Sequence, residues 1–410
     1  MVSAQGDADQ PDRWYLMGEN SQAAAEDRVS TPSSGANSLS CPGEGVGSDS
    51  IELRDVRSSD AQQVYELAAS VHAEREGQLL KSRWVWQYES NPRGAPGQVV
   101  AAVRDNTIIA ILCGIGQRFW INGQEHSGVW LADFMAYPVP GAVGRSVASA
   151  LARHQTIKHP LSLGHQRPAI TRYWQRLRGK QGGKKICEAN VLALPLRVSP
   201  FIADKLPRGP LGRWLGALAD FAVRSRAGFR SRRALSEYSF ESAKTCGAEF
   251  DDFWNSAKVG YPALAVRDRA YVDWRYLQAP NRDYQLRVAR VAGSLVGWVV
   301  YRVVPETSPR QVRIVDMLVA PEKVDVAKHL LAGTVREVMH RPADVVKVVE
   351  TQVPWMALAH TAVGFVKRGQ SNLGADYTGT PADGIAPDFF YDPSNWYFSY
   401  GDGDTDMYGP

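Results

Sequence analysis

An internal repeat constrains the fold of this chain more than any other feature of its sequence. Three residue types recur at one spacing of 188 positions: Trp86 and Trp274, Tyr88 and Tyr276, and Pro92 and Pro280. When three pairs of different residue types share one spacing, the sequence indicates a structural unit that occurs twice. We therefore interpret the chain as two copies of a domain rather than as one large domain.

Further matches follow in the same order along both copies. Asp133 in DFMAYP corresponds to Asp316 in DMLVAP, 183 positions later, so one loop of the second copy is five residues shorter. Next come two matches at a spacing of 186 positions: Gln166 with Gln352, and Pro168 with Pro354. Apolar residues between these positions alternate as in β-hairpins and then recur at helical spacing. The predicted fold class is α/β, with a mixed, mainly antiparallel sheet flanked by helices in each copy.

Composition divides the chain into five segments. Its 410 residues fit two domains of ordinary size. Residues 1–50 carry eight acidic side chains against two arginines and lack apolar periodicity, so we expect disorder there. The predicted segments are a disordered acidic tail (1–48), a first domain with the candidate cofactor site (49–196), a basic helical connector (197–245), a second, degenerate domain (246–400) and an acidic C-terminal tail (401–410).

The connector lies within a strongly basic stretch. From His165 to Leu235 the chain has sixteen Lys and Arg residues against three acids, a net charge of +13. One helix is predicted from Leu211 to Arg226. We expect this helix to pack the two halves together. Two alternatives stay open, namely peripheral contact of residues 211–233 with an anionic membrane surface and binding of nucleic acid.

The remaining composition argues for a cytoplasmic protein without a metal centre. The sequence has no apolar run of membrane-spanning length and no leader peptide at its start. Its four cysteines stand singly, without the close pairs typical of zinc sites. Asp402–Asp406, in DGDTD, suggests calcium ligands, but the EF-hand pattern needs Gly at its sixth position, where Met407 stands. We predict a frayed acidic tail there and no metal.

The order of elements from residue 51 to 400 resembles the GNAT superfamily of acyl-CoA N-acyltransferases. The tandem form is similar to bacterial double-GNAT proteins, which share a Trp-x-Tyr element early in each half. In that family a strand ending near Pro leads into a Gly-rich turn, whose backbone N–H groups hold the pyrophosphate of acetyl-CoA together with the next helix. The resemblance thus implies acetyl-CoA, or another acyl-CoA, as co-substrate.

The first copy contains a candidate for this turn. Six residues of YPVPGAVGRS are the predicted cofactor-binding residues: Gly141, Ala142, Val143, Gly144, Arg145 and Ser146. Their register departs from the usual family pattern of Arg or Gln, two residues, Gly, one residue, and Gly or Ala. The corresponding APEKVDVAKHLL has no glycine, and Glu322 and Asp325 would repel a diphosphate there. We therefore expect the cofactor in the first copy alone.

Two residues of the first copy are the predicted catalytic residues. Tyr173 follows Gln166 and Ala169 at the spacing of a family helix, and the resemblance implies that its phenol protonates the departing thiolate. Asp133 is the candidate acceptor of the amine proton. A structural role for either residue is the alternative, because a tyrosine ring can pack in the core and because Asp133 recurs as Asp316. The position of Tyr173 is taken by His360 in the second copy.

The resemblance implies an acetyl-CoA dependent N-acyltransferase. Its acceptor would be an amine of a small molecule or peptide, held near the cleft between the copies. One alternative is a transferase similar to the aminoacyl-tRNA dependent enzymes of the peptidoglycan bridge, which would bind tRNA through a basic surface. The other is a non-catalytic GNAT-fold scaffold. The sequence does not decide the acceptor, the acyl chain length or the oligomeric state.

Overall fold

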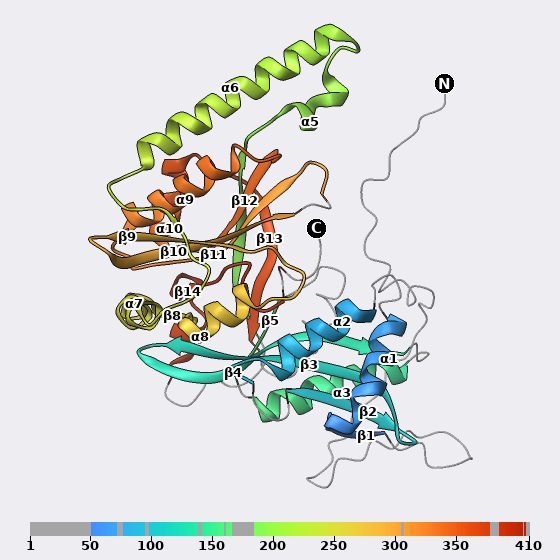
Figure 1. Ribbon diagram of the computed structural model, residues 1–410. Coiled ribbons are helices and arrows are strands. Elements are labelled where there is room, and N and C mark those ends of the chain that lie inside the picture. The colour runs from blue at the N-terminus through green and yellow to red at the C-terminus, as the bar shows by residue number, and fades with distance from the viewer. Residues whose placement is uncertain are drawn as a thin grey trace.

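The computed structural model describes residues 51–71, 77–94, 98–137, 142–159, 161–165, 184–304, 307–377, 385–404 and 406. Within these residues, 14 strands form one continuous sheet that is flanked by helices (Figure 1). The predicted tail 1–48 lies outside the described residues. Among the helices of the described residues, none has both the length and the apolarity needed to span a bilayer.

The first half forms one end of the sheet. Its strands are β1 (Glu52–Asp55), β2 (Val99–Arg104), β3 (Thr107–Ile121), β4 (Gln124–Ala136), β5 (Ser162–His165) and β6 (Lys184–Pro195). Its helical segments are η2 (Ser58–Asp60), α1 (Ala61–Val71), α2 (Gly77–Trp84), the π-helix η3 (Val85–Glu89) and α3 (Ala142–Lys158).

Alternation along β2 explains why helices cover both faces of this part of the sheet. Val99 and Ala101 are buried against α1, whereas Val100 and Ala102 are buried against α3. Successive side chains of a strand point to opposite faces, so an all-apolar strand requires a cover on each side. α1 and α3 thus enclose the strands that carry the candidate site.

The second half repeats this plan. Its strands are β7 (Glu241–Ser242), β8 (Ala263–Ala265), β9 (Gln285–Val291), β10 (Ser294–Val304), β11 (Gln311–Val319), β12 (Val345–Glu350), β13 (Val366–Tyr377) and β14 (Trp396–Tyr397). Its helical segments are α7 (Glu249–Ala257), η5 (Lys258–Gly260), α8 (Arg269–Val272), the π-helix η6 (Asp273–Leu277), α9 (Val324–Val338), α10 (Pro354–Val363), α11 (Pro387–Phe390) and η7 (Pro393–Asn395).

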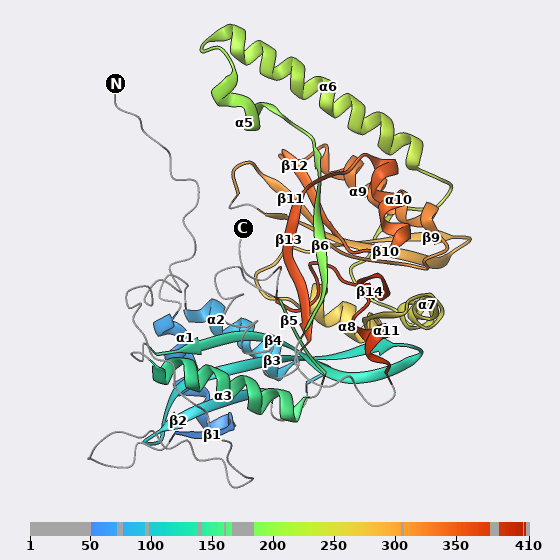
Figure 2. The same cartoon turned by 180° about the vertical axis from the view of Figure 1, so that it is seen from behind.

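The two halves exchange strands where they meet. The sheet order is β1-β2-β3-β4-β5-β13-β6-β12-β11-β10-β9-β7. β13, from the second half, lies between β5 and β6, while β6, from the first half, lies between β13 and β12. Figure 2 shows these two long strands side by side along the middle of the molecule. Each half therefore completes the sheet of the other.

The repeated Trp-x-Tyr elements meet at the junction of the halves. Trp86 in η3 and Trp274 in η6 stack with their ring centroids 4.9 Å apart. They are only 6% and 3% exposed, respectively, so both belong to the core. Their position agrees with the repeat that the sequence predicts and relates the two copies by an approximate two-fold arrangement.

The connector contains a longer helix than predicted. α5 (Ser199–Ile202) and η4 (Ala203–Lys205) precede α6, which spans Pro210–Ala234 instead of ending at Arg226. α6 lies along α9 and α10 at the end of the molecule opposite α1 and α3 (Figure 1). The expectation that this helix packs the two halves together is therefore wrong. The buried positions of α6 are small residues. Gly212 and Gly216 near its start face the preceding segment at Pro207, Leu206 and Ser199, and the half-buried Gly228 near its end faces Met339 of the second half.

The acidic C-terminal segment does not fray where the structure describes it. Asp402 and Asp406 are fully buried. Asp402 pairs with Arg267 at 2.8 Å, and Asp406 pairs with Arg302 and Arg313 at 2.8 Å each. The prediction of a frayed tail is wrong because these buried arginines lie on distant segments, which the local composition cannot reveal. Residue 405 and residues 407–410 lie outside the described residues.

Candidate active site

The two parallel strands β4 and β5 of the first half pair over a short stretch only. β4 and β5 pair only from Val129 with Ser162 to Leu131 with Gly164. Beyond Leu131, β4 stays paired with β3, whereas β5 pairs with β13 on its other side. The two strands therefore stop pairing with each other and diverge after Leu131.

Asp133 lies in a β-bulge at this divergence. Ala132 pairs with Cys113 and Met135 with Ile111, so two residues of β4 oppose a single residue of β3. Asp133 has a φ of 44°, a conformation that Asp tolerates better than most side chains. A bulge of this kind redirects a side chain out of the regular alternation. It turns Asp133 toward η3 and α2.

Donors from these helices converge on one carboxylate oxygen of Asp133. Tyr88 Oη donates to Oδ2 at 2.6 Å, Arg83 Nη2 at 2.7 Å and Gln87 Nε2 at 3.3 Å. Burial and the neighbouring charge of Asp133 raise the pKa of Tyr88 well above its usual value. The tyrosine therefore stays protonated at neutral pH and serves as a hydrogen-bond donor.

Asp133 also lines a pocket beside the bulge. The lining residues are Tyr65, Ala68, Arg83, Trp84, Tyr88, Asp133 and Met135. Three of the seven are aromatic, and Arg83 pairs with Asp133, so the pocket offers apolar surface together with an ion pair. Such a combination is typical of small-molecule sites.

The candidate cofactor residues lie at the start of α3. The helix begins at Ala142, and Val143, Gly144, Arg145 and Ser146 follow within its first turns. The first four N–H groups of a helix have no partner within the helix and favour an anion. Gly141 lies outside the described residues. These assignments stay predictions.

Tyr173, the predicted proton donor, lies outside the described residues, between β5 and β6. Its catalytic role therefore stays a prediction. β5 ends at His165 and β6 begins at Lys184.

The corresponding strands of the second half also pair over a short stretch, and the C-terminal segment contacts β11 beyond it. β11 and β12 pair only from Gln311 with Val345 to Arg313 with Lys347. Beyond this pairing, Gly401 N–H donates to Val315 O at 2.9 Å, and the Tyr397 hydroxyl donates to Met317 O. The C-terminal segment thus occupies the place beside β11 where its pairing with β12 has ended.

A buried ion-pair network holds this segment. Arg267 Nε lies 3.0 Å from Asp316 Oδ2, and Arg267 Nη2 lies 2.8 Å from Asp402 Oδ2, with all three side chains fully buried. Tyr276 Oη donates to Asp316 at 2.7 Å, as Tyr88 does to Asp133. The repeated aspartates thus share a structural role as acceptors for the repeated tyrosines.

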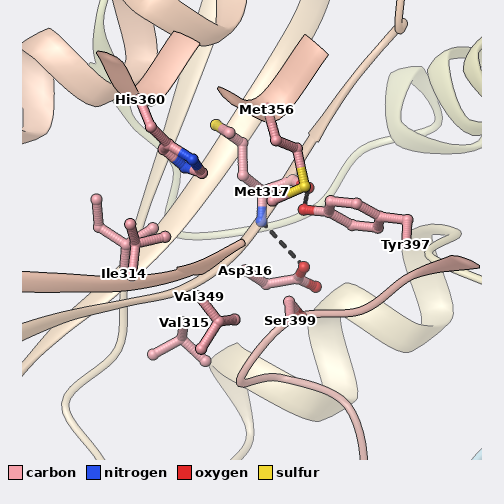
Figure 3. Close-up of a pocket in the computed structure, with 10 residues that line it drawn as sticks. Ile314, Val315, Asp316, Met317, Val349, Met356, His360, Tyr397 and Ser399 are labelled. Atoms are coloured by element: carbon pink, nitrogen blue, oxygen red, sulfur yellow. Dashed lines mark hydrogen bonds between the residues drawn. The ribbon is translucent and has the colours of Figure 1, made fainter. Parts of the chain in front are cut away.

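His360 lines the small cavity that remains in the second half. Its Nδ1 lies 3.0 Å from Glu350 Oε2, and its Nε2 has no hydrogen-bond partner among the described residues. Figure 3 shows His360 facing Tyr397 and Ser399 across Asp316 and Met317. The arrangement encloses the imidazole instead of presenting it to solvent.

Sequence reasoning missed most of the pocket around Asp133. Tyr65, Arg83 and Trp84 were not predicted as site residues, because each fits an ordinary amphipathic helix. The sequence did contain one signal of this site. Tyr88 and Asp133 are 45 residues apart, and their copies Tyr276 and Asp316 are 40 apart, so both members of a contact recur. A pair that recurs in both copies indicates a contact.

Sequence comparison gives no relatives for this chain. No family model matches it, and no curated protein matches it.

Solved structures nevertheless match its fold. A conserved protein of unknown function from Enterococcus faecalis V583, a probable N-acyltransferase, is 10% identical, with a TM-score of 0.53 over 80% of this chain and 72% of that one. A GCN5-related N-acetyltransferase from Anabaena variabilis is 11% identical, with a TM-score of 0.52 over 80% and 72%. Saccharomyces cerevisiae N-myristoyltransferase with bound myristoyl-CoA is 9% identical, with a TM-score of 0.50 over 86% and 88%.

At these identities the likeness concerns the fold. The chain has the GNAT fold in two tandem copies, as the order of its elements predicts. Among the described residues, no group of three or more His, Cys, Asp or Glu side chains is placed to bind a metal ion.

Proposed function

We propose that the chain transfers an acyl group from acyl-CoA to an amine at a single site in the first half. One observation carries the proposal. In the first half, α3 begins at Ala142 within the glycine-containing segment Gly141 to Ser146, whereas in the second half Tyr397 and Gly401 hydrogen-bond to β11 just beyond its pairing with β12. Fold alone does not give function, and this asymmetry between the copies distinguishes one site from the other.

The first turn of α3 is the proposed site of the CoA pyrophosphate. Backbone N–H groups of Ala142 to Ser146 would face the phosphates, with Gly141 and Gly144 allowing a close approach. Arg145 would add a positive charge. We propose acetyl-CoA as the acyl donor. The N-myristoyltransferase of similar fold has myristoyl-CoA bound, so acyl chains of several lengths belong in the test.

The proposed chemistry is an attack of the neutral amine on the thioester carbonyl carbon. A C–N bond forms, the C–S bond breaks, and the CoA thiolate leaves. Tyr173 gives its phenolic proton to this thiolate, and Asp133 takes the proton that the amine loses, directly or through water. Proton return from Asp133 to Tyr173 through solvent restores both groups.

The acceptor amine would enter from the pocket that Asp133 lines. Tyr65, Trp84 and Tyr88 offer aromatic faces there. A carboxylate beside aromatic rings attracts a cationic amine before it loses its proton. We therefore propose an amine of a small molecule or a peptide as the acceptor.

Calorimetric titration of the 410-residue chain with acetyl-CoA tests the proposal. We expect micromolar binding that Gly144→Glu abolishes, because a carboxylate at the start of α3 repels the phosphates. Gly369→Glu is the matched control. Gly369 is exposed in β13, and a Cβ added there would meet no atom within 4 Å, so this variant should bind acetyl-CoA as the unaltered chain does. Decanoyl-CoA and myristoyl-CoA as further ligands test chain length. Absence of binding to all three thioesters would sink the proposal.

A further inference from the structure

Large apolar side chains gather on the outward face of α6. The structure exposes eleven large hydrophobic residues, and six of them lie on α5 and α6: Phe201, Leu211, Trp214, Leu218, Phe221 and Phe229. The five on α6 are between 51% and 69% exposed. Their spacing of three, four, three and eight residues puts them in one stripe along the helix.

The opposite face of α6 is built from small residues. Gly212, Gly216, Ala227 and Ser231 are its buried positions. A Cβ on Gly212 would lie 1.7 Å from Pro207 O in the turn that precedes the helix, and a Cβ on Gly228 would lie 3.4 Å from Met339 Cε of the second half. An ordinary surface helix buries its large apolar residues and exposes polar ones. α6 has the reverse arrangement, so packing among the residues that the structure describes does not account for its stripe.

Positive charge borders the stripe. Arg213, Arg226, Arg232 and Arg233 are exposed. The single acidic residue of the helix, Asp220, points inward, where it accepts from Val198 N–H at 2.7 Å and pairs with Arg197 at 3.1 Å. The outward face thus combines apolar side chains with arginines and contains no carboxylate.

We propose that this face of α6 binds an anionic lipid surface. A helix of 25 residues is about 38 Å long and can lie flat along a bilayer with its apolar stripe at the level of the acyl chains. Trp and Phe are suited to that depth. The bordering arginines would contact the anionic headgroups, each strengthening binding by about fivefold.

Lipid fits this face better than the other candidate occupants. An RNA would contact the arginines but leave five large apolar side chains against phosphates and water. A second copy of the same face would oppose arginine to arginine across a two-fold axis. An anionic bilayer complements both the apolar stripe and the charge around it.

The location of α6 is compatible with such docking. α6 lies at the end of the molecule opposite β1, α1 and α3, as both views show (Figures 1 and 2). The pocket at Asp133 therefore stays accessible when α6 faces a membrane. The proposal does not depend on the acyltransferase proposal, and failure of either leaves the other standing.

Cosedimentation of the 410-residue chain with vesicles tests the proposal. We expect binding to phosphatidylcholine vesicles that contain about 30% phosphatidylglycerol, and at least tenfold weaker binding to phosphatidylcholine alone. The double variant Phe221→Glu/Phe229→Glu should lose at least tenfold in affinity for the anionic vesicles, because two anchors are replaced by repelling charges. Arg226→Ala/Arg233→Ala should lose about 25-fold, and added salt should weaken binding of the unaltered chain.

The control replaces equally exposed apolar residues elsewhere. Ile157→Glu/Val259→Glu changes positions that are 69% and 71% exposed on α3 and η5, and should bind vesicles unchanged. Equal loss in both double variants would overturn the proposal, as would absence of binding to anionic vesicles. It would also fail if sedimentation velocity showed a lipid-free dimer that Phe221→Glu/Phe229→Glu dissolves. Binding of tRNA that those two substitutions leave intact, without vesicle binding, would favour nucleic acid instead.

Discussion

Trp86 and Trp274 hydrogen-bond to each other's backbone in both directions. The indole N–H of Trp86 donates to Trp274 O at 2.8 Å, and that of Trp274 donates to Trp86 O at 2.8 Å. Two residues that match in the sequence repeat thus form one symmetrical contact in the core. The contact joins η3 of the first half to η6 of the second, so it couples the stability of the halves.

Replacing either tryptophan by phenylalanine should therefore destabilise the whole chain. Trp86→Phe leaves the buried carbonyl of Trp274 without its donor, which costs about 1–3 kcal/mol of unfolding free energy. Trp274→Phe should cost a similar amount, and the double variant less than the sum, because the two residues share one contact. Urea unfolding measures all three. Trp214→Phe, at a position 62% exposed, is the control. Additive losses would contradict a shared contact.

Two glycines of α6 should respond to alanine with opposite signs. Gly212→Ala brings a methyl group to 1.7 Å from Pro207 O and should lower the unfolding free energy by about 2 kcal/mol. Gly228→Ala meets Met339 Cε at 3.4 Å, an ordinary contact, and should raise the unfolding free energy by about 0.5–1 kcal/mol through helix propensity. Thermal unfolding compares the pair. Stabilisation by both substitutions would show that the start of α6 is not held against Pro207.

Asp60 should make stability depend on acid pH. Its hydrogen bond from Arg54, at 2.6 Å, lowers the pKa of this carboxyl. A lowered pKa stabilises the fold above the unfolded value of about 4, and that contribution is lost as pH falls through the folded value. Asp60→Asn should lower the unfolding free energy by about 2 kcal/mol at pH 7, with a smaller difference below pH 3.

The matched control for Asp60 is Asp105→Asn. It removes the same charge from an exposed turn between β2 and β3 and keeps a residue type that tolerates the φ of 49° found there. Urea unfolding at both pH values distinguishes the variants. A loss for Asp60→Asn that is equal at pH 7 and below pH 3 would show that the Arg54 contact is not the cause.

Asp133 and Asp316 allow catalysis to be separated from structure. Each accepts a hydrogen bond from a repeated tyrosine, but the side chain of Asp316 is fully buried in an ion pair with Arg267, whereas that of Asp133 is 7% exposed beside its pocket. If Asp133 accepts the amine proton, Asp133→Asn should reduce kcat by about 100-fold or more. Asp316→Asn should reduce stability, with kcat of the folded fraction unchanged. Equal kcat losses would assign both aspartates to structure alone.

The sequence was sufficient to predict the tandem fold because the repeat joins residues of unlike type at fixed spacing. It could not predict the exchange of β6 and β13, since pairing partners depend on contacts far apart in the chain. The burial of Asp402 was missed for a related reason. Its partner Arg267 is 135 residues away, and an acidic segment without its partner is indistinguishable from a solvated tail.

For the candidate site, sequence reasoning identified the strand residue Asp133 but not the pocket. A bulge turns this side chain toward Arg83 and Tyr88, and period-two alternation cannot anticipate a bulge. The predicted cofactor residues follow from a pattern of glycines before a helix, and α3 does begin at Ala142. Titration with acetyl-CoA, with and without Gly144→Glu, tests whether these residues contact a cofactor.

The placement of β13 between β5 and β6 has a consequence for biosynthesis. A ribosome completes residues 51–195 long before it reaches Val366–Tyr377, so the sheet of the first half must wait with β5 unpaired on one side. Unpaired strand edges invite association with other chains. Release of the finished polypeptide, rather than emergence of the first half, is therefore the event that completes folding, and a nascent chain stalled before residue 366 should be a substrate for chaperones.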